Sequence, residues 1–398
     1  MVDGRRSGLR RTPGLSYWLA AAVALVGIAV QFIPWPAAWI DRVYVARWLP
    51  LWQRAAAALS GDLTFSLSYV LVGLSLSVLA AGTVTTLVAP RRAAKGSSSP
   101  WRPLLALVAW IVAVLVGWFP FGFGLAYHAS SLSAAVGAIS PSDLDRAVAW
   151  SLGELNAAAA LTSTTTAGAD GAQAGLPPHE AQAAASRCVA TAALSVREAF
   201  LPATVLAQGA PPTLPTRVKP LPPGTLLRFG YAGIVSPWLL EPHVDAGLPP
   251  TSGLAVALHE LAHVAGFAQE AEAEAIGLLA GLTCDASVVR YAAAFHLASS
   301  VAAGMSQAER ATYVGAWPER AVAEARAAAA ASARYEIKAL RSSANVVYDA
   351  YLRAQGGADG LREYDRGTLL GLALLLKLGV VSGAGSDVGE ADLHSGLP

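Results

Sequence analysis

The sequence predicts a mainly α-helical protein, in which an N-terminal membrane anchor of three helices precedes an α-rich domain with a small sheet. The 398 residues are 54% hydrophobic and 14% charged, whereas soluble domains carry about 25% charged residues. The apolar excess lies in three long runs before residue 125, and the Ala-rich remainder mixes polar and apolar residues as a globular domain does. We therefore expect an anchor over residues 1–125 and a domain over residues 126–398.

The three apolar runs cover residues 15–33, 63–88 and 103–124. Each comes close to the ~20 residues that a helix needs to cross the hydrocarbon core of a bilayer. A cleaved signal peptide is the alternative for the first run, but Pro34 and Trp35 follow it where small residues should mark a cleavage site. We expect all three runs to contact membrane lipid as spans.

Basic residues set the expected orientation of these spans. Four arginines precede the first run, and the connection between the second and third runs holds Arg91, Arg92, Lys95 and Arg102. Short basic segments stay in the cytoplasm. A multi-pass protein of the cell membrane is therefore predicted, with a cytoplasmic N-terminus and an extracytoplasmic domain after residue 125.

The net charge and the two cysteines limit the possible partners and cross-links. A net charge of +1 gives no electrostatic case for binding nucleic acid. Cys188 and Cys284 are too few for a cysteine-based zinc knuckle. In an exported domain they could form one disulfide, and two unpaired buried thiols fit the sequence equally well.

Capping residues, prolines and apolar patterns predict the elements of the domain. Residues 209–224 hold six prolines and should be irregular, while residues 226–235 resemble a strand. Residues 369–381 are too short for a fourth span and suit a buried or amphipathic C-terminal helix. The predicted helices cover residues 140–160, 179–200 and 253–265, and an Ala-rich stretch from 270 to 353 that breaks near Cys284 and Trp317.

The motif that carries chemistry is His259-Glu260-Leu261-Ala262-His263. Two histidines four residues apart share one helix face and can bind one metal ion through ring nitrogens. The glutamate after the first histidine projects beside them, where it can deprotonate a metal-bound water. The alternative is a pair of histidines inside an apolar helix, but burying three unpaired polar side chains would be costly. The motif therefore predicts a Zn²⁺ site with Glu260 as general base.

A third ligand should come from the acidic residues that follow the turn at Gly266. On a new helix Glu270 and Glu274 share a face, while Glu272 points away. Glu270 fits best as the ligand, and Glu274 would then orient one of the histidines. Glu272 remains the alternative ligand. If no metal binds, the three glutamates would form a solvated acidic face.

Other polar residues have weaker patterns. Glu241 and His243 lie upstream of the motif and fit a surface loop better than the wall of a substrate cleft. Several further side chains could stabilise an oxyanion, although each is more often a packing or surface residue. They are Arg290, Tyr291, His296, Tyr348 and Tyr351.

Residues 259–274, reading HELAHVAGFAQEAEAE, resemble a motif of a bacterial membrane family called domain of unknown function 3810. This chain has Glu274 where that family usually has Asn. The resemblance implies a few N-terminal spans joined to a zincin-like domain with a gluzincin-type site, and it supplies no substrate. Looser similarities lie at Gly124-Leu125-Ala126-Tyr127, Lys219-Pro220, Gly233-Ile234 and Arg290-Tyr291.

Together the motif and the resemblance lead us to expect a membrane-anchored zinc-dependent metallohydrolase, with a peptide or protein as substrate. The alternative is a non-enzymatic membrane protein that retains a metal-bound zincin scaffold. Intramembrane proteolysis is disfavoured, because the motif lies far beyond the last apolar run and on a helix too short to cross a bilayer.

Overall fold

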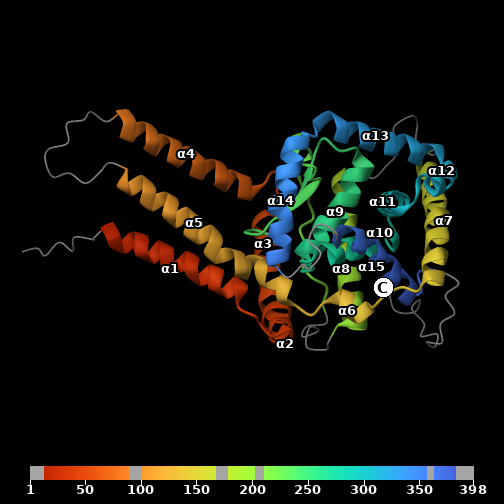
Figure 1. Cartoon of the computed structure of the whole chain (residues 1–398), viewed down its shortest axis with the longest axis horizontal. Helices are drawn as coiled ribbons and strands as arrows, with labels where there is room; N and C mark the ends of the chain where they lie inside the picture. The colour runs from red at the N-terminus through yellow and green to blue at the C-terminus, as the bar shows by residue number, and fades with distance from the viewer. Residues whose placement is uncertain (1–12, 89–100, 167–177, 202–209, 356–362, 382–398) are drawn as a thin grey trace, which may run out of the picture.

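Three long helices project from one side of a helical body in the computed structural model (Figure 1). The structure describes residues 13–88, 101–166, 178–201, 210–355 and 363–381. The projecting helices are α1 (Pro13–Phe32), α4 (Leu67–Val88) and α5 (Arg102–Gly122). The body is mainly helical and contains a three-stranded sheet, in agreement with the predicted mainly-α fold.

Two of the projecting helices, over Leu67–Thr85 and Leu104–Gly122, are individually long and apolar enough to cross a membrane. A third crossing is available if Ser16–Phe32 and Ala37–Ser60, which meet at an angle of 113°, form one broken span. The described residues therefore offer two or three membrane-crossing helices, where the sequence predicted three. Only 6% of the candidate span in α4 and 11% of the candidate span in α5 are buried inside the protein, so both helices need an apolar environment around them.

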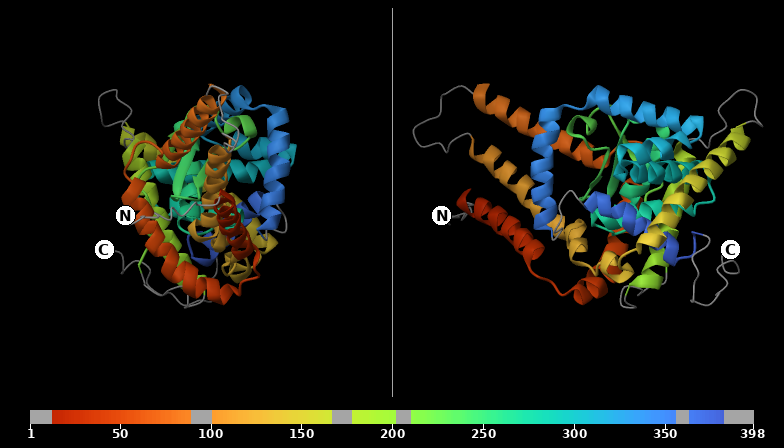
Figure 2. Two further views of the ribbon diagram at one scale, coloured as in Figure 1. Left: turned by 90° about the vertical axis from the view of Figure 1, so that its left-hand side faces the viewer. Right: turned by 45° about the vertical axis from the view of Figure 1, so that its right-hand side comes forward.

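Helices α1 and α5 pack closely, and α4 stands apart from them along most of its length (Figures 1 and 2). A Cβ atom at Gly27 of α1 would lie 2.5 Å from the Cα atom of Gly117 of α5, so a glycine permits this close approach. On α4, Leu71, Leu74 and Leu76 are each at least half exposed. The projecting part is thus a tight helix pair with a separate third helix.

The connection between α1 and α4 is built into the body. It forms α2 (Ala37–Trp39), the π-helical segment η1 (Ile40–Trp48) and α3 (Leu49–Ser60). Tyr44 and Leu49 are buried in the main apolar core. The Gln53 side chain donates a hydrogen bond of 2.7 Å to the carbonyl of Val264. The N-terminal segment therefore contributes side chains to the core of the body.

The sheet has the order β1-β3-β2, with β1 (Lys219–Leu221) parallel and β2 (Gly233–Ser236) antiparallel to β3 (Glu241–Asp245). The prediction of a surface loop at Glu241 and His243 is wrong, since both lie on the central strand and are almost fully buried. The irregular segment predicted over 209–224 includes β1. The strand predicted over 226–235 divides into a 3₁₀ turn, η4 (Leu227–Phe229), and β2.

Helix α9 lies at the centre of the body, against β3 and helices α8, α10 and α11. The structure has helices where they were predicted over 140–160, 179–200 and 253–265, and the predicted breaks near Cys284 and Trp317 are present. Two further breaks, at Met305 and Glu336, were not predicted, and the buried C-terminal helix begins at Glu363 and ends at Lys377. A disulfide joins Cys188 of α8 to Cys284 after α10, with their Cα atoms 5.6 Å apart. The remaining elements are η2 (Gly124–His128), α6 (Leu132–Val136), α7 (Pro141–Thr166), α8 (Pro178–Phe200), α9 (Pro250–Val264), α10 (Glu270–Leu282), α11 (Ser287–Gly304), α12 (Gln307–Gly315), α13 (Glu319–Tyr335), α14 (Lys338–Ala354) and α15 (Glu363–Lys377).

Candidate metal site

A sharp turn between α9 and α10 brings the motif and the acidic residues together. Gly266 adopts a φ of +105°, and a Cβ atom there would lie 2.6 Å from Leu49 Cδ2. Glycine is therefore required at this position both by its backbone conformation and by the lack of space. Gly277 of α10 lets the two helices approach, since its Cβ would lie 3.1 Å from the backbone nitrogen of His259. The first turn of α10 consequently returns over the last turns of α9.

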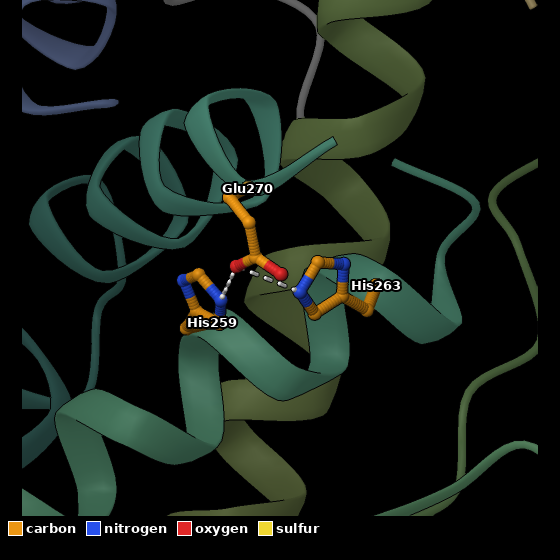
Figure 3. A group of neighbouring side chains, drawn as sticks. All are labelled: His259, His263 and Glu270. Atoms are coloured by element: carbon orange, nitrogen blue, oxygen red, sulfur yellow. Dashed lines mark hydrogen bonds and ion pairs between the residues drawn. The ribbon is translucent and has the colours of Figure 1, made fainter. Parts of the chain in front are cut away.

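Three side chains converge at this crossing, His259 and His263 from α9 and Glu270 from α10 (Figure 3). The Glu270 Oε2 atom lies 3.1 Å from His259 Nε2 and 3.4 Å from His263 Nε2. Two ligand atoms bound tetrahedrally to one zinc ion, each at about 2.1 Å, are separated by roughly 3.4 Å. The spacing of the three donors, which all lie within 4.8 Å of one another, therefore fits a zinc ion.

Both histidines are oriented by hydrogen bonds on the far side of the ring. His263 Nδ1 donates to the carbonyl of Phe267 at 2.8 Å. His259 Nδ1 lies 3.2 Å from Glu274 Oε2, and Glu274 Oε1 is 2.6 Å from His296 Nε2. Such contacts set the tautomer that leaves Nε2 available to a metal. Glu274 thus lies where an orienting residue should be, and His296 contacts it rather than the cavity.

Glu272 points away from the two histidines. Its Oε1 atom accepts a hydrogen bond of 2.7 Å from the backbone nitrogen of Leu132 and one of 3.2 Å from the Ser131 hydroxyl. These contacts cap the first turn of α6, whose backbone donors have no partners within the helix. Of the two alternatives for a third ligand, the structure brings Glu270 and not Glu272 to the histidines.

Glu260 is buried beside the edge of the sheet. Its carboxylate lies so close to β2 that a Cβ atom at Gly233 would come within 2.5 Å of Glu260 Oε1. Burial raises the pKa of Glu260 to about 7, against the opposing effect of the two neighbouring histidines. Burial also acts to raise the pKa of Glu270, but His263 and His259 lower it well below its ordinary value.

A cavity of about 500 Å³ opens directly over this cluster, and Glu260, His259, His263 and Glu270 form part of its wall. Tyr348 and Tyr351 from α14 line it, as do residues of α4, α5 and β2. The Tyr348 hydroxyl donates to Glu270 Oε1 at 2.5 Å, and the Tyr351 hydroxyl donates to that of Tyr127 at 3.4 Å. Two of the predicted oxyanion-stabilising residues therefore reach the site.

Other predicted residues lie outside this cavity. Arg290 pairs with Glu154 through contacts of 2.5 and 3.0 Å. Tyr291 is buried in the core beneath the guanidinium of Arg320, 4.3 Å from its ring centroid. Neither residue is therefore available to a substrate in the cavity.

Sequence patterns did not predict three tyrosines of the cavity wall, Tyr69 of α4, Tyr127 and Tyr231. Tyr127 follows α5, and Tyr231 precedes β2 and contacts the ring of Tyr348. Tyr127 lies in Gly124-Leu125-Ala126-Tyr127, one of the looser similarities to the family, but that similarity gave the tyrosine no role. Tyr231 carried no pattern that could have marked it.

These features define a class of protein: a mainly helical chain with candidate membrane helices and a His–His–Glu cluster beneath a cavity. The chain belongs to a family of proteins of unknown function, DUF3810, whose family model matches residues 44–371. The resemblance found in the sequence is thus confirmed, and the match begins in η1 and ends in α15. No curated protein and no solved structure gave a significant match.

Proposed function

We propose that the protein is a membrane-anchored, zinc-dependent metallohydrolase of zincin type that cleaves peptide bonds. The observation that carries this proposal is the convergence of His259, His263 and Glu270 beneath the cavity, with Glu260 beside them. Two imidazoles and one carboxylate are a ligand set of catalytic zinc sites, in which a further position serves water or substrate. When bound, zinc lowers the pKa of a coordinated water and polarises a carbonyl group.

Glu260 is the proposed proton carrier of the reaction. A carboxylate buried at the wall of a cavity can accept a proton from water and deliver it to the leaving amine. Its position next to Gly233 places it beside the backbone of β2, where a bound peptide would lie. The hydroxyl groups of Tyr348 and Tyr351, which donate to Glu270 and Tyr127 in this structure, are proposed to redirect their hydrogen bonds to the developing oxyanion when a substrate binds.

The edge of β2 supports a peptide as the substrate. Among the described residues, β3 is the strand paired with β2, and the opposite edge of β2 borders the cavity. Asp245 donates a backbone hydrogen bond to Ala232, so alternation along the antiparallel ladder turns the backbone groups of Gly233 and Val235 away from β3. An extended peptide can pair with these groups as an added strand.

We also propose that the body lies outside the cytoplasm. The Cys188–Cys284 disulfide supports this placement, because disulfides persist in oxidising compartments. The basic residues before α1 and between α4 and α5 support the same orientation.

The test combines metal analysis with a quenched fluorescent peptide library, applied to the full chain in detergent. The wild type should hold zinc and cleave peptides in a chelator-sensitive way. Glu260→Gln should keep its zinc and lose cleavage by at least roughly 10²-fold, whereas Glu270→Ala should lose the zinc itself. Stoichiometric zinc without turnover in the wild type would support the non-enzymatic alternative. Full activity of Glu260→Gln would refute its role.

A further inference from the structure

The wall of the cavity is built partly from the candidate membrane helices. Tyr69 and Val72 of α4 and Phe119 of α5 line the cavity that contains the histidine cluster. These residues lie within Leu67–Thr85 and Leu104–Gly122, the two stretches that qualify by themselves as membrane spans. The cavity therefore extends from the His–His–Glu cluster to the two candidate membrane helices.

The α4 side of this wall is open to its surroundings. Tyr69 and Val72 are 44% and 40% exposed even though they line the cavity. The α1–α5 contact is tight by comparison, so the open side lies along α4 and not between α1 and α5. An apolar chain in the bilayer can thus approach the cavity from the membrane.

The part of the wall next to α4 presents a sheet edge, with Ile234 of β2 46% exposed and Ser236 hydrogen-bonded to Ser68 of α4 at 2.7 Å. Such an edge recognises the backbone of an extended polypeptide, which a lipid or a detergent-like molecule lacks. One cavity therefore combines a surface for a peptide backbone with an entrance for an apolar chain. A substrate that uses both has a peptide segment directly joined to a membrane-embedded one.

We propose that the substrate is a membrane-anchored polypeptide, whose segment next to its apolar anchor enters alongside α4 and lies along β2. This inference rests on the proposed function, because it names the substrate class of that same site. The cut would fall just outside the hydrocarbon core, close to the anchor. Soluble peptides would enter as poor substrates, since they lack the apolar segment that brings the cleavage site to the cavity.

The binding test uses the full-length Glu260→Gln chain in phosphatidylcholine vesicles, so that turnover cannot consume the probe. The probe is a synthetic peptide that carries a photo-crosslinking phenylalanine analogue, with or without an attached Leu-Ala segment of about 20 residues. The anchored probe should crosslink to α4 or β2 with a yield at least roughly tenfold above that of the unanchored probe. Equal yields, or crosslinks confined to other elements, would overturn the inference.

A pair of variants on α4 tests the entrance itself. Val72→Trp places a bulky ring in the cavity wall, whereas Val78→Trp makes the same change at a residue that is 54% exposed and does not line the cavity. The first variant should reduce crosslinking of the anchored probe severalfold, and the second should match the wild type. Equal yields from both variants would show that the anchored chain does not pass this part of α4.

Cleavage by the wild type separates this inference from the proposed function. If anchored and unanchored peptides are cut at the same rate, the proposed peptidase activity is supported and the inference of a membrane-anchored substrate is wrong. If neither is cut but the anchored probe crosslinks beside β2, the peptidase proposal fails and the binding site for an anchored polypeptide remains supported.

Discussion

Glu274 lies between two histidines, with one carboxylate oxygen 3.2 Å from His259 Nδ1 and the other 2.6 Å from His296 Nε2. Burial acts to raise its pKa, but the two histidines lower the pKa below the ordinary value. The carboxylate therefore acts as an acceptor for both rings. It holds His259 in the orientation that directs Nε2 toward Glu270.

We expect Glu274→Ala to weaken zinc binding without abolishing it. Loss of a residue that orients a metal ligand typically lowers metal affinity by about 10–100-fold. The measurement is the zinc dissociation constant of the full chain, obtained by competition with a chromogenic chelator. An unchanged constant would show that Glu274 has no orienting role.

Glu272→Ala is the matched control, since Glu272 is also a buried carboxylate on α10 but faces α6. It should leave the zinc constant unchanged and lower the free energy of unfolding by about 1 kcal/mol, because the capping contact to α6 is lost. Loss of zinc from this variant would instead make Glu272 the third ligand.

At the scale of single residues, the sequence predicted those members of the site that lie close to one another in the chain. His259, Glu260 and His263 lie on one helix, so helical spacing relates them, and Glu270 follows after a short turn at the start of the next helix. The tyrosines of α14 and Tyr127 reach the cavity only through tertiary packing. Sequence spacing carries no information about such contacts.

At the scale of elements, one carboxylate of the central strand holds the start of α4. Glu241 accepts hydrogen bonds from the backbone nitrogens of Leu67 and Ser68, at 2.9 and 2.8 Å, and from the Ser66 hydroxyl at 3.1 Å. Burial acts to raise the pKa of Glu241, but these bonds lower it overall. His243, two residues along β3, contacts the same Ser66 hydroxyl at 2.9 Å. The sheet thereby anchors the first turn of a candidate membrane helix.

We expect Glu241→Gln to lower the thermal unfolding midpoint at neutral pH. An amide group presents N–H to backbone N–H donors, and lost hydrogen bonds to a charged group cost roughly 2 kcal/mol. The measurement is calorimetric unfolding of the full chain in detergent, with the exposed Glu319→Gln as control. Equal midpoints for the two variants would contradict the anchoring role.

The same contact predicts how the effect depends on pH. Because the folded-state pKa of Glu241 is lowered, its stabilising contribution is complete above the unfolded-state pKa of about 4.3. The contribution is lost as the pH falls through the lower, folded-state pKa. The difference between wild type and Glu241→Gln should therefore be constant from neutral pH to about pH 5 and shrink under more acidic conditions.

The sheet was harder to predict than the helices because of its prolines. Pro220 and Pro242 lie within β1 and β3, and proline cannot donate to a ladder. Pro242 comes one residue before the first pairing of β3 with β1, and it faces Val235 at a pair without ladder bonds, so its missing N–H leaves the sheet intact. Most helices, by contrast, keep their prolines at or before the first turn, and long runs of alanine and apolar residues mark them in the sequence.

At the scale of the whole molecule, the disulfide connects the topology to chemistry. Cys188 and Cys284 are 96 residues apart in the chain, and their bond ties α8 to the turn after α10. The sequence could not choose between paired and unpaired thiols, since only the packing of α8 against α10 brings the two side chains together. An oxidised pair is stable only where the surroundings are oxidising.

We expect both thiols to resist alkylation when whole cells expressing the chain are treated with a denaturant and a maleimide, and to react after reduction. Cys188→Ser should expose one reactive thiol and lower the free energy of unfolding by roughly 2–4 kcal/mol. Two reactive thiols without reduction would place the body in the cytoplasm and contradict the proposed orientation.

The N-terminal segment inside the body has a consequence for how the chain is made. Tyr44, Leu49 and Gln53 emerge from the ribosome early, but their partners at Val264 and Gly266 follow more than 200 residues later. Until then the apolar residues of η1 and α3 lack these partners, although α1 and α4, the hydrophobic helices on either side of them, have already been synthesised. The α9–α10 turn therefore docks on a segment made long before it, whereas α14, which completes the cavity wall, and α15, which packs against α10, are made later still.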